Sequence, residues 1–385
     1  MTTALREAPP TTNPSSAPGN AASAWRGLLI DDSLSLVNRT GAHFIAKDLV
    51  AHFRETALVR RWRLFGADMP QGLARKLLAR AMLLEMRWLG SRPGLRWPER
   101  ARCRRLFLDP LYVMRAELDP GDMVLCHDIG PLSHTALYLP ETVRWYEAAY
   151  ARVAERRPGL VFVSETSKAA FTARFGNDFR FLHSIPLYVR SESAGGPDEP
   201  VPGITAPFFL TVGALEHRKN HLATITAFER SGLADAGVTL VLCGSRGDAT
   251  EQVQQRVASA RGVLLPGYVS DAQLRWLYRN AIAFVLPSLL EGFGMPALEA
   301  AQHGLIPIIS GDSALNEAVG GLGLPIDEHD PDSIASAMHS VRQLAAPERA
   351  AWQQRLREHA RGATREHFLQ QWDRLISTEL ERTTA

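Results

Sequence analysis

The chain has 385 residues, 45% of them hydrophobic and 22% charged, a composition typical of a globular protein with room for two domains. Its three cysteines, Cys103, Cys126 and Cys243, are far apart and lack the spacing of a zinc site, so we expect reduced thiols in a cytoplasmic protein. No apolar run is long enough to cross a bilayer, which argues against an integral membrane protein.

The first half of the chain alternates between apolar strands and helices. Residues 1–24 are rich in Pro, Ser, Thr and Ala and contain no hydrophobic signal region, so we expect a disordered tail there. Within 25–190, strand patterns cover 25–33, 122–128 and 160–165, and helical patterns cover 41–55 and 141–157. This alternation predicts a parallel α/β sheet that binds ligands at the carboxyl ends of its strands.

One region of the first half is strongly basic. Residues 54–105 carry fourteen basic and four acidic side chains, although the whole chain has a net charge of only +2. The segment QGLARKLLARAMLLEMRWLG inside it has apolar residues at roughly helical spacing. A basic amphipathic helix of this kind can lie on an anionic membrane surface. The alternative is a core-packed helix with a solvated basic face, and the sequence leaves both open.

The second half repeats the alternation. Residues 191–204 are rich in Pro and Gly and poor in apolar side chains, which indicates an interdomain linker. Residues 205–355 begin with the strand PFFLTVGAL and the helix NHLATITAFERSG, and they predict a second doubly wound domain. The polar helical stretch 356–385 is expected to pack back onto the first domain.

Two adjacent cations mark the first turn of the second domain. Arg218 and Lys219 follow its first strand in the segment GALEHRKNH, which begins at Gly213. Their place at a strand–helix turn suits a diphosphate, because the start of a helix also offers amide groups to an anion. The alternative is a solvent-exposed basic pair beside a helix cap at Asn220.

The segment EGFGMPALEA holds two carboxylates, Glu291 and Glu299, around a glycine turn at the end of an apolar strand. Gly292 and Gly294 permit a positive φ or a close approach of the backbone to a ligand. A carboxylate near a helix start is stabilised by the helix dipole, which explains Glu299 but not Glu291. Carboxylates in such a place commonly accept hydrogen bonds from hydroxyls, so the pattern indicates a sugar or a ribose.

These segments, together with LCGS, GYVSDAQLRWLYRNA and NEAVGG, resemble the donor-binding half of the family 4 retaining glycosyltransferases, which have the GT-B fold. The resemblance covers most of residues 205–340 in the family's motif order. In the first half, RTGAHFIAKDL, LCHDIGPLSH and VFVSETSKAAFTARFG are similar to the family more loosely, whereas 54–118 matches none of its segments. The resemblance implies an α/β protein with two Rossmann-like, doubly wound domains facing each other across a cleft.

The resemblance also implies roles for single residues. Arg218 and Lys219 are expected to neutralise the donor diphosphate, and Glu299 to accept the ribose hydroxyls. Glu291 is expected to hold the sugar's hydroxyls with the amides of Phe293 and Gly294. His127 is expected across the cleft, beside the sugar. The other donor-binding residues that it implies are Gly41, Gly213, Gly244, Ser245, Val269 and Gly292. The family is typically metal-independent, so no metal or other cofactor is expected.

The function implied is the transfer of a hexose with retention, with mannose from GDP-mannose as the first choice of nucleotide-sugar donor. The acceptor would be a glycan or a polyprenyl-diphosphate-linked glycan in bacterial surface polysaccharide synthesis, which would explain a basic region facing the inner side of the cell membrane. A sugar-nucleotide epimerase of GT-B fold is an alternative, because it would use the same cleft without an acceptor. A non-catalytic protein that binds a membrane or nucleic acid is another, although no array of stacking aromatic residues supports nucleic acid.

Overall fold

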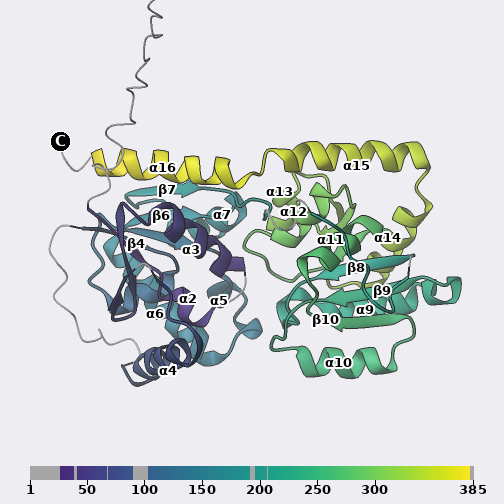
Figure 1. Ribbon diagram of the computed structural model, residues 1–385, viewed down its shortest axis with the longest axis horizontal. Helices are drawn as coiled ribbons and strands as arrows, with labels where there is room; N and C mark the ends of the chain where they lie inside the picture. The colour runs from purple at the N-terminus through teal and green to yellow at the C-terminus, as the bar shows by residue number, and fades with distance from the viewer. Residues whose placement is uncertain are drawn as a thin grey trace, which may run out of the picture.

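The structure is a computed structural model that describes residues 27–38, 41–66, 68–89, 103–190, 196–205 and 207–381. The chain forms two α/β domains that lie side by side (Figure 1). The tail expected at 1–24 lies outside the described residues. Among the described helices, none combines the length and the hydrophobicity that a bilayer crossing needs.

The first domain is built on a seven-stranded sheet with the strand order β3-β2-β1-β4-β5-β6-β7. All neighbouring strands run parallel except β2 and β3, which are antiparallel. The strands are β1 (Leu28–Asp31), β2 (Ala57–Arg61), β3 (Leu64–Phe65), β4 (Arg104–Phe107), β5 (Met123–Cys126), β6 (Gly159–Phe162) and β7 (Phe181–Ser184). The helices are α2 (Leu34–Val37), α3 (Gly41–His52), α4 (Gly72–Leu89), α5 (Gly130–Ser133), α6 (Pro140–Arg156) and α7 (Glu165–Phe175), with 3-10 turns η1 (Pro110–Arg115) and η2 (Thr135–Leu137).

The second domain is built on a six-stranded parallel sheet with the order β10-β9-β8-β11-β12-β13. Its strands are β8 (Phe208–Val212), β9 (Thr239–Cys243), β10 (Val263–Gly267), β11 (Phe284–Leu286), β12 (Pro307–Ser310) and β13 (Leu324–Ile326). Its helices are α9 (His221–Arg230), α10 (Thr250–Ser259), α11 (Asp271–Asn280), α12 (Met295–Gln302), α13 (Ala314–Ala318), α14 (Pro331–Gln343) and α15 (Ala346–Arg361), with 3-10 turns η3 (His217–Lys219) and η4 (Leu233–Ala236). The last helix, α16 (Arg365–Glu381), packs on the first domain. The two doubly wound sheets that the sequence predicts are therefore present.

Both sheets reverse their strand order next to their first strand, between β1 and β4 and between β8 and β11. Crevices at the carboxyl ends of the strands beside such a reversal are where open α/β sheets bind ligands. The central strands β1, β5 and β6 are buried along their whole length, as expected for parallel strands covered by helices on both faces.

The segment that the sequence could not place, 54–118, contains β2, β3, α4 and β4. Three of its cations are buried in ion pairs: the closest contacts of Arg60 with Asp31, of Arg61 with Asp32 and of Arg105 with Asp122 are each 2.7 Å. Their carboxylate partners come from outside the basic stretch. The charge count along the sequence therefore overstates how many cations of this region face solvent.

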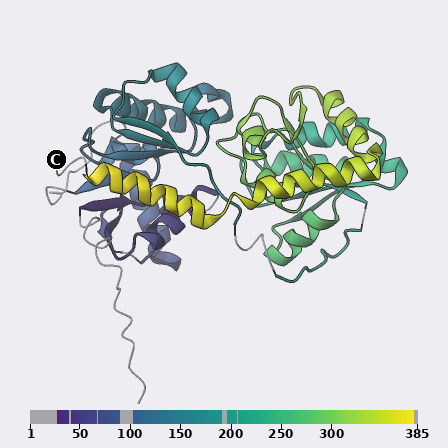
Figure 2. The same ribbon diagram turned by 90° about the horizontal axis from the view of Figure 1, so that it is seen from above.

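The last two helices join the domains. In yellow in Figure 2, α15 runs along the second domain and α16 along the first. The chain crosses near Gly362, where the Val189 amide donates to the Ala363 carbonyl at 3.0 Å. Helix α16 is held by Arg180, whose Nε lies 2.7 Å from Glu379 Oε2. The boundary expected at 356 falls inside α15, which continues to Arg361, because apolar residues such as Leu356 still pack on the second domain.

Candidate functional site

A cavity of about 740 Å³ lies between the domains, where the carboxyl ends of the two sheets face each other. Both domains contribute to its wall. It is lined by each site residue that the sequence singled out, namely Gly41, His127, Gly213, Arg218, Lys219, Gly244, Ser245, Val269, Glu291, Gly292, Phe293, Gly294 and Glu299. The fold thus brings the predicted residues to one place, although they come from six separate stretches of the chain.

The cations Arg218 and Lys219 lie in the turn η3, directly after β8. Gly213 follows that strand, and a Cβ added there would lie 3.4 Å from Lys219 Cε, so a glycine leaves room for the lysine side chain. Asn220 follows with φ of 56°, a left-handed conformation that asparagine tolerates, and α9 starts after it. The Asn220 side chain does not cap α9, and instead its Nδ2 donates to the Glu328 carbonyl at 2.7 Å.

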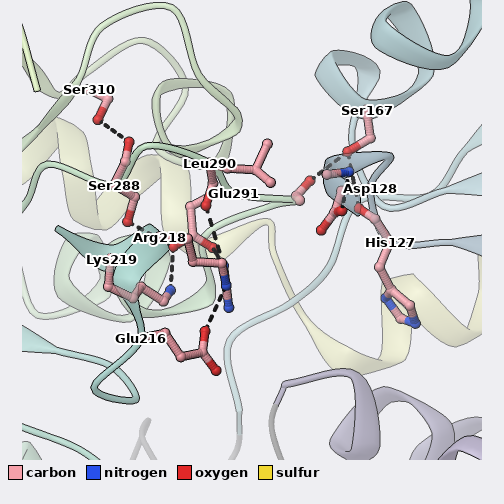
Figure 3. Close-up of polar contacts among 12 residues, drawn as sticks. His127, Asp128, Ser167, Glu216, Arg218, Lys219, Ser288, Leu290, Glu291 and Ser310 are labelled. Carbon is pink, nitrogen blue, oxygen red and sulfur yellow. Dashed lines mark hydrogen bonds and ion pairs between the residues drawn. The ribbon is translucent and has the colours of Figure 1, made fainter. Parts of the chain in front are cut away.

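Glu291 holds both cations (Figure 3). Its Oε2 accepts from Arg218 Nη1 at 3.0 Å, and its Oε1 accepts from Lys219 Nζ and, at 3.0 Å, from Ser288 Oγ. On its other side, Arg218 Nε lies 2.7 Å from Glu216 Oε2. The carboxylate expected to meet sugar hydroxyls is therefore the counter-ion of the cation pair in this structure.

Burial and charge act in opposite directions on this cluster. Burial by itself raises the pKa of Glu291, but Lys219 and Arg218 outweigh it and lower that pKa to about 2. Burial lowers the pKa of Lys219, and Glu291 opposes this. Because its carboxylate has a depressed pKa and two cationic neighbours, we take Glu291 to be ionised at neutral pH.

The Glu299 carboxylate also has partners within the protein. It is 2% exposed, its Oε1 accepts from Arg190 Nε at 2.7 Å, and its Oε2 accepts from the Tyr278 hydroxyl at 3.1 Å. The Arg190 guanidinium lies over the Phe44 ring, 5.2 Å from its centroid, and both residues line the cavity. Sequence reasoning missed Arg190, because a single arginine just before a linker carries no pattern that would single it out.

The glycines of the turn serve contacts within the protein. Gly294 has φ of 107°, which favours glycine, and it precedes α12. A Cβ on Gly292 would lie 2.3 Å from the His127 carbonyl oxygen, and one on Gly244 would lie 1.9 Å from the Gly213 carbonyl oxygen. Their lack of a side chain thus allows two backbones to approach each other, including the backbones of the two domains.

His127 lies across the cavity at the end of β5, as the sequence predicted. Its Nε2 is 3.1 Å from the Leu108 carbonyl oxygen, which makes Nε2 the protonated nitrogen and leaves Nδ1 as a possible acceptor. Its own carbonyl accepts from Ser167 Oγ at 3.1 Å (Figure 3). The same Ser167 hydroxyl also lies 3.0 Å from the Gly292 carbonyl oxygen, so it touches both domains.

A second set of polar contacts joins the two domains. The Glu317 carboxylate of α13 accepts from the amides of Glu165 and Thr166 at 2.7 and 2.8 Å, and from the Thr166 hydroxyl at 2.7 Å. It thereby covers the positive amino end of α7 in the other domain. Ser164 Oγ adds a hydrogen bond to the Gly292 carbonyl at 2.6 Å.

Asp109 is a cavity residue that sequence reasoning also missed. It follows β4, lies beside His127 and is 6% exposed. Its carboxylate accepts from the Leu111 amide at 2.8 Å and from the Tyr146 hydroxyl at 3.0 Å. Burial raises its pKa, and His127 opposes that rise. No signal pointed to it, because β4 lies in the part of the sequence that could not be placed.

Comparisons with known proteins agree with this geometry. Residues 199–359 match the family of glycosyl transferases group 1. The chain is 35% identical over 229 residues to the O-antigen chain mannosyltransferase B of Escherichia coli, covering 57% of this chain and 60% of the relative. It is 26% identical over 242 residues to the serotype-specific mannosyltransferase WbdA of Escherichia coli, covering 56% of this chain and 28% of the relative. The chain thus spans less than two thirds of the length of either relative.

Among solved structures, an alpha,alpha-trehalose-phosphate synthase (UDP-forming) from Burkholderia vietnamiensis superposes with a TM-score of 0.62 at 11% identity. The match covers 93% of this chain and 98% of that one. At this identity the likeness speaks for the fold alone, and it confirms the GT-B architecture of two facing Rossmann-like domains.

Proposed function

We propose that this chain is a group 1 glycosyltransferase, the family that residues 199–359 match, and that it transfers mannose from GDP-mannose with retention of configuration. The acceptor in this proposal is a glycan, free or linked to a polyprenyl diphosphate, in bacterial surface polysaccharide synthesis. Support for mannose comes from relatives named O-antigen mannosyltransferases. The family match covers residues 199–359, whereas the proposal concerns the activity of the whole protein.

The observation that carries the proposal is the cation pair of Arg218 and Lys219 on the cavity wall. Both residues line the cavity, and their side chains are 26% and 7% exposed, so Arg218 is the more accessible of the two while Lys219 is packed against Glu291. A donor diphosphate placed here gains charge stabilisation as its bond to the anomeric carbon breaks. Arg218 can exchange its contact with Glu216 for one with the diphosphate, because the Glu216 side chain is 22% exposed, whereas that of Glu291 is 6% exposed.

The chemistry follows from what the cavity offers. We propose that the two cations stabilise the charge of the leaving diphosphate without a metal ion. We propose that the acceptor hydroxyl attacks the anomeric carbon on the face from which the diphosphate departs, and that the departing phosphate oxygen takes the hydroxyl proton. The new glycosidic bond then forms on the same face as the broken one. His127 and Asp109 face this reaction from the first domain, where they are placed to orient the sugar and the acceptor.

A membrane-bound acceptor fits the outer surface of α4. Four of its exposed apolar side chains, Leu73, Leu77, Leu84 and Trp88, are four, seven and four residues apart and therefore form one stripe. The exposed cations Lys76, Arg80 and Arg87 flank that stripe, whereas Met82 and Met86 are buried on the opposite side of the helix. We propose that this face lies on an anionic membrane. Lys76→Glu should weaken binding to phosphatidylglycerol vesicles, and Lys168→Glu on α7 is the matched control.

The function is tested with purified protein and a panel of GDP-, UDP- and dTDP-sugars. We expect turnover with GDP-mannose and a lipid-linked glycan acceptor, and a loss of about a hundredfold or more in kcat/KM for Arg218→Ala. Arg246→Ala is the control, because Arg246 is an exposed arginine on a neighbouring loop that does not line the cavity. Unchanged turnover in Arg218→Ala, or no turnover of any sugar nucleotide, would overturn the proposal, and donor conversion without acceptor would point to an epimerase.

A further inference from the structure

A second cavity, of about 640 Å³, lies in the first domain between α2, α3 and the start of α4. It is separate from the cavity between the domains and shares none of its lining residues. Its charged lining consists of four cations and one carboxylate, namely Lys47, Arg54, Arg61, Arg75 and Asp32. We call this cavity the basic pocket.

The single carboxylate of the basic pocket is already satisfied. Asp32 Oδ2 accepts from Arg61 Nε at 2.7 Å, and Asp32 Oδ1 accepts from Ser35 Oγ at 2.5 Å. Arg61 is 4% exposed, and its Nη1 donates to the carbonyls of Gly66 and Asp68. Its Nη2 makes no hydrogen bond with any described residue. Asp32 thus compensates Arg61 alone, and a donor nitrogen of Arg61 remains for a ligand.

The other three cations have weak partners or none. Lys47 is exposed and makes no ion pair within the described part of the chain. Arg54 reaches Asp68 only at 3.6 Å, between side chains that are 64% and 95% exposed, and such pairs contribute little. Arg75 Nη1 donates to the Leu36 carbonyl, which is neutral. The basic pocket therefore has an excess of three positive charges around a hollow.

The surroundings of the basic pocket indicate which anion it takes. On one side, α3 separates it from the cavity between the domains: Gly41 and Ala42 line that cavity, whereas Lys47 lines the basic pocket. On the other side, Arg75 lies in the first turns of α4, on the face of that helix opposite the exposed Leu73 and Leu77. An anion bound here would lie beneath α4, whose outer face carries the apolar stripe, and one helix away from the reaction. Arginine and lysine together suit phosphate oxygens.

We propose that the basic pocket binds the phosphate or diphosphate group of a lipid. Two sources share this chemistry, the diphosphate of a lipid-linked acceptor and the head group of an anionic phospholipid. The proposal that a lipid phosphate binds here depends on the pocket and its charges, and not on the sugar donor. Only the identification of that lipid as the acceptor rests on the proposed function. Lipid binding is measured below without turnover, so its failure and a failure of the proposed function are distinguishable.

The four lysines of the chain make the test specific to each surface. Lys47 reports on the basic pocket, Lys76 on the outer face of α4, Lys219 on the cavity between the domains, and Lys168 on an uninvolved part of α7. The rate at which each lysine of the full chain is acetylated is followed by mass spectrometry. The probes are geranyl diphosphate, vesicles of phosphatidylcholine, and vesicles that also contain phosphatidylglycerol.

If the source is a lipid diphosphate, geranyl diphosphate slows acetylation of Lys47 about tenfold or more, because the bound phosphate holds the Lys47 ammonium group, and it leaves the acetylation rate of Lys168 unchanged. Phosphatidylglycerol vesicles then protect Lys76 but not Lys47. If the source is a phospholipid head group, those vesicles protect Lys47 together with Lys76, and phosphatidylcholine vesicles do not. Protection of Lys47 by neither probe overturns the proposal.

Matched arginine variants locate the binding. Arg75→Ala should abolish the protection of Lys47, whereas Arg355→Ala should retain it, because Arg355 is an exposed arginine of α15 that lines neither cavity and lies outside the proposed membrane face. Arg54→Ala is a second pocket variant whose exposed side chain carries little risk to folding. Equal protection in the pocket variants and in Arg355→Ala would show that the lipid binds elsewhere and would overturn the assignment.

Discussion

Replacing Glu291 by alanine should destabilise the protein as well as stop turnover. In the native structure its carboxylate is 6% exposed and is shared by Arg218 and Lys219. The variant leaves Lys219, itself 7% exposed, without its counter-ion. Removing one partner of a buried ion pair typically costs about 3–5 kcal/mol, because the remaining charge stays buried without compensation.

The pKa of Glu291 leads to a similar magnitude. It falls from 4.5 to about 2 in the folded state, because the attraction of Lys219 and Arg218 exceeds the opposing effect of burial. A shift of this size corresponds to about 3 kcal/mol. A depressed carboxyl pKa stabilises the fold at pH values above about 4.5, and the contribution is lost as the pH falls toward 2. The difference in stability between wild type and Glu291→Ala should therefore narrow below pH 4.5.

The assay is urea unfolding at pH 7, in which we expect the free energy of unfolding of Glu291→Ala to be lower by about 3 kcal/mol. Glu216→Ala is the control, since Glu216 contacts the same Arg218 but its side chain is 22% exposed, and we expect a loss below about 1 kcal/mol. Added GDP should raise the melting temperature of Glu291→Ala more than that of the wild type, because a diphosphate supplies the missing negative charge. Equal stability of the two variants would refute the reasoning.

Three further outcomes are expected. Glu317→Ala should raise the radius of gyration in X-ray scattering and increase KM, because three hydrogen bonds between the domains are lost. Thr166→Val removes one of these three bonds and should have a smaller effect. Equal effects of the two variants would show that these hydrogen bonds do not hold the domains together. Burial lowers the pKa of His221 to about 4 from 6.5, so wild-type stability should fall by about 3 kcal/mol as the pH drops from 6.5 to 4. In His221→Asn this slope in thermal unfolding should flatten, and an unchanged slope would rule out His221 as its cause. Arg190→Ala should raise the KM for the donor about tenfold, because Glu299 loses its cationic partner. Arg190→Lys should restore part of the donor affinity. Donor binding in Arg190→Ala equal to that of the wild type would argue against a role for the Arg190–Glu299 ion pair.

Much of the second domain could be predicted from the sequence, because its signals are local. Short apolar runs that end in glycine, such as the one before Gly213, indicate buried parallel strands. Pro296 and Gly304 indicate where α12 begins and ends, and the structure has this helix at Met295–Gln302. The carboxyl ends of parallel strands meet at one edge, so residues just after them, including Arg218 and Glu291, were expected to share a cavity.

Local patterns were less informative for the first domain. Its basic stretch could not be divided into exposed and buried cations, because Arg60 and Arg105 are neutralised by Asp31 and Asp122, which lie 29 and 17 positions away. Strands that contain buried arginines lack the apolar alternation by which strands are recognised. For the same reason Asp109, which follows one of these strands, had no context that would single it out.

The sequence by itself determined the two α/β sheets, the turn that carries Arg218 and the position of Glu291 at a strand end, since these depend on neighbours along the chain. Only the tertiary structure decided what each charged group meets. It pairs Glu291 with the cations beside it and Glu299 with Arg190, and it places Lys47 in a hollow with too few acids. The free energy of a charge depends on its burial and on partners distant in sequence, and neither can be read from a local pattern.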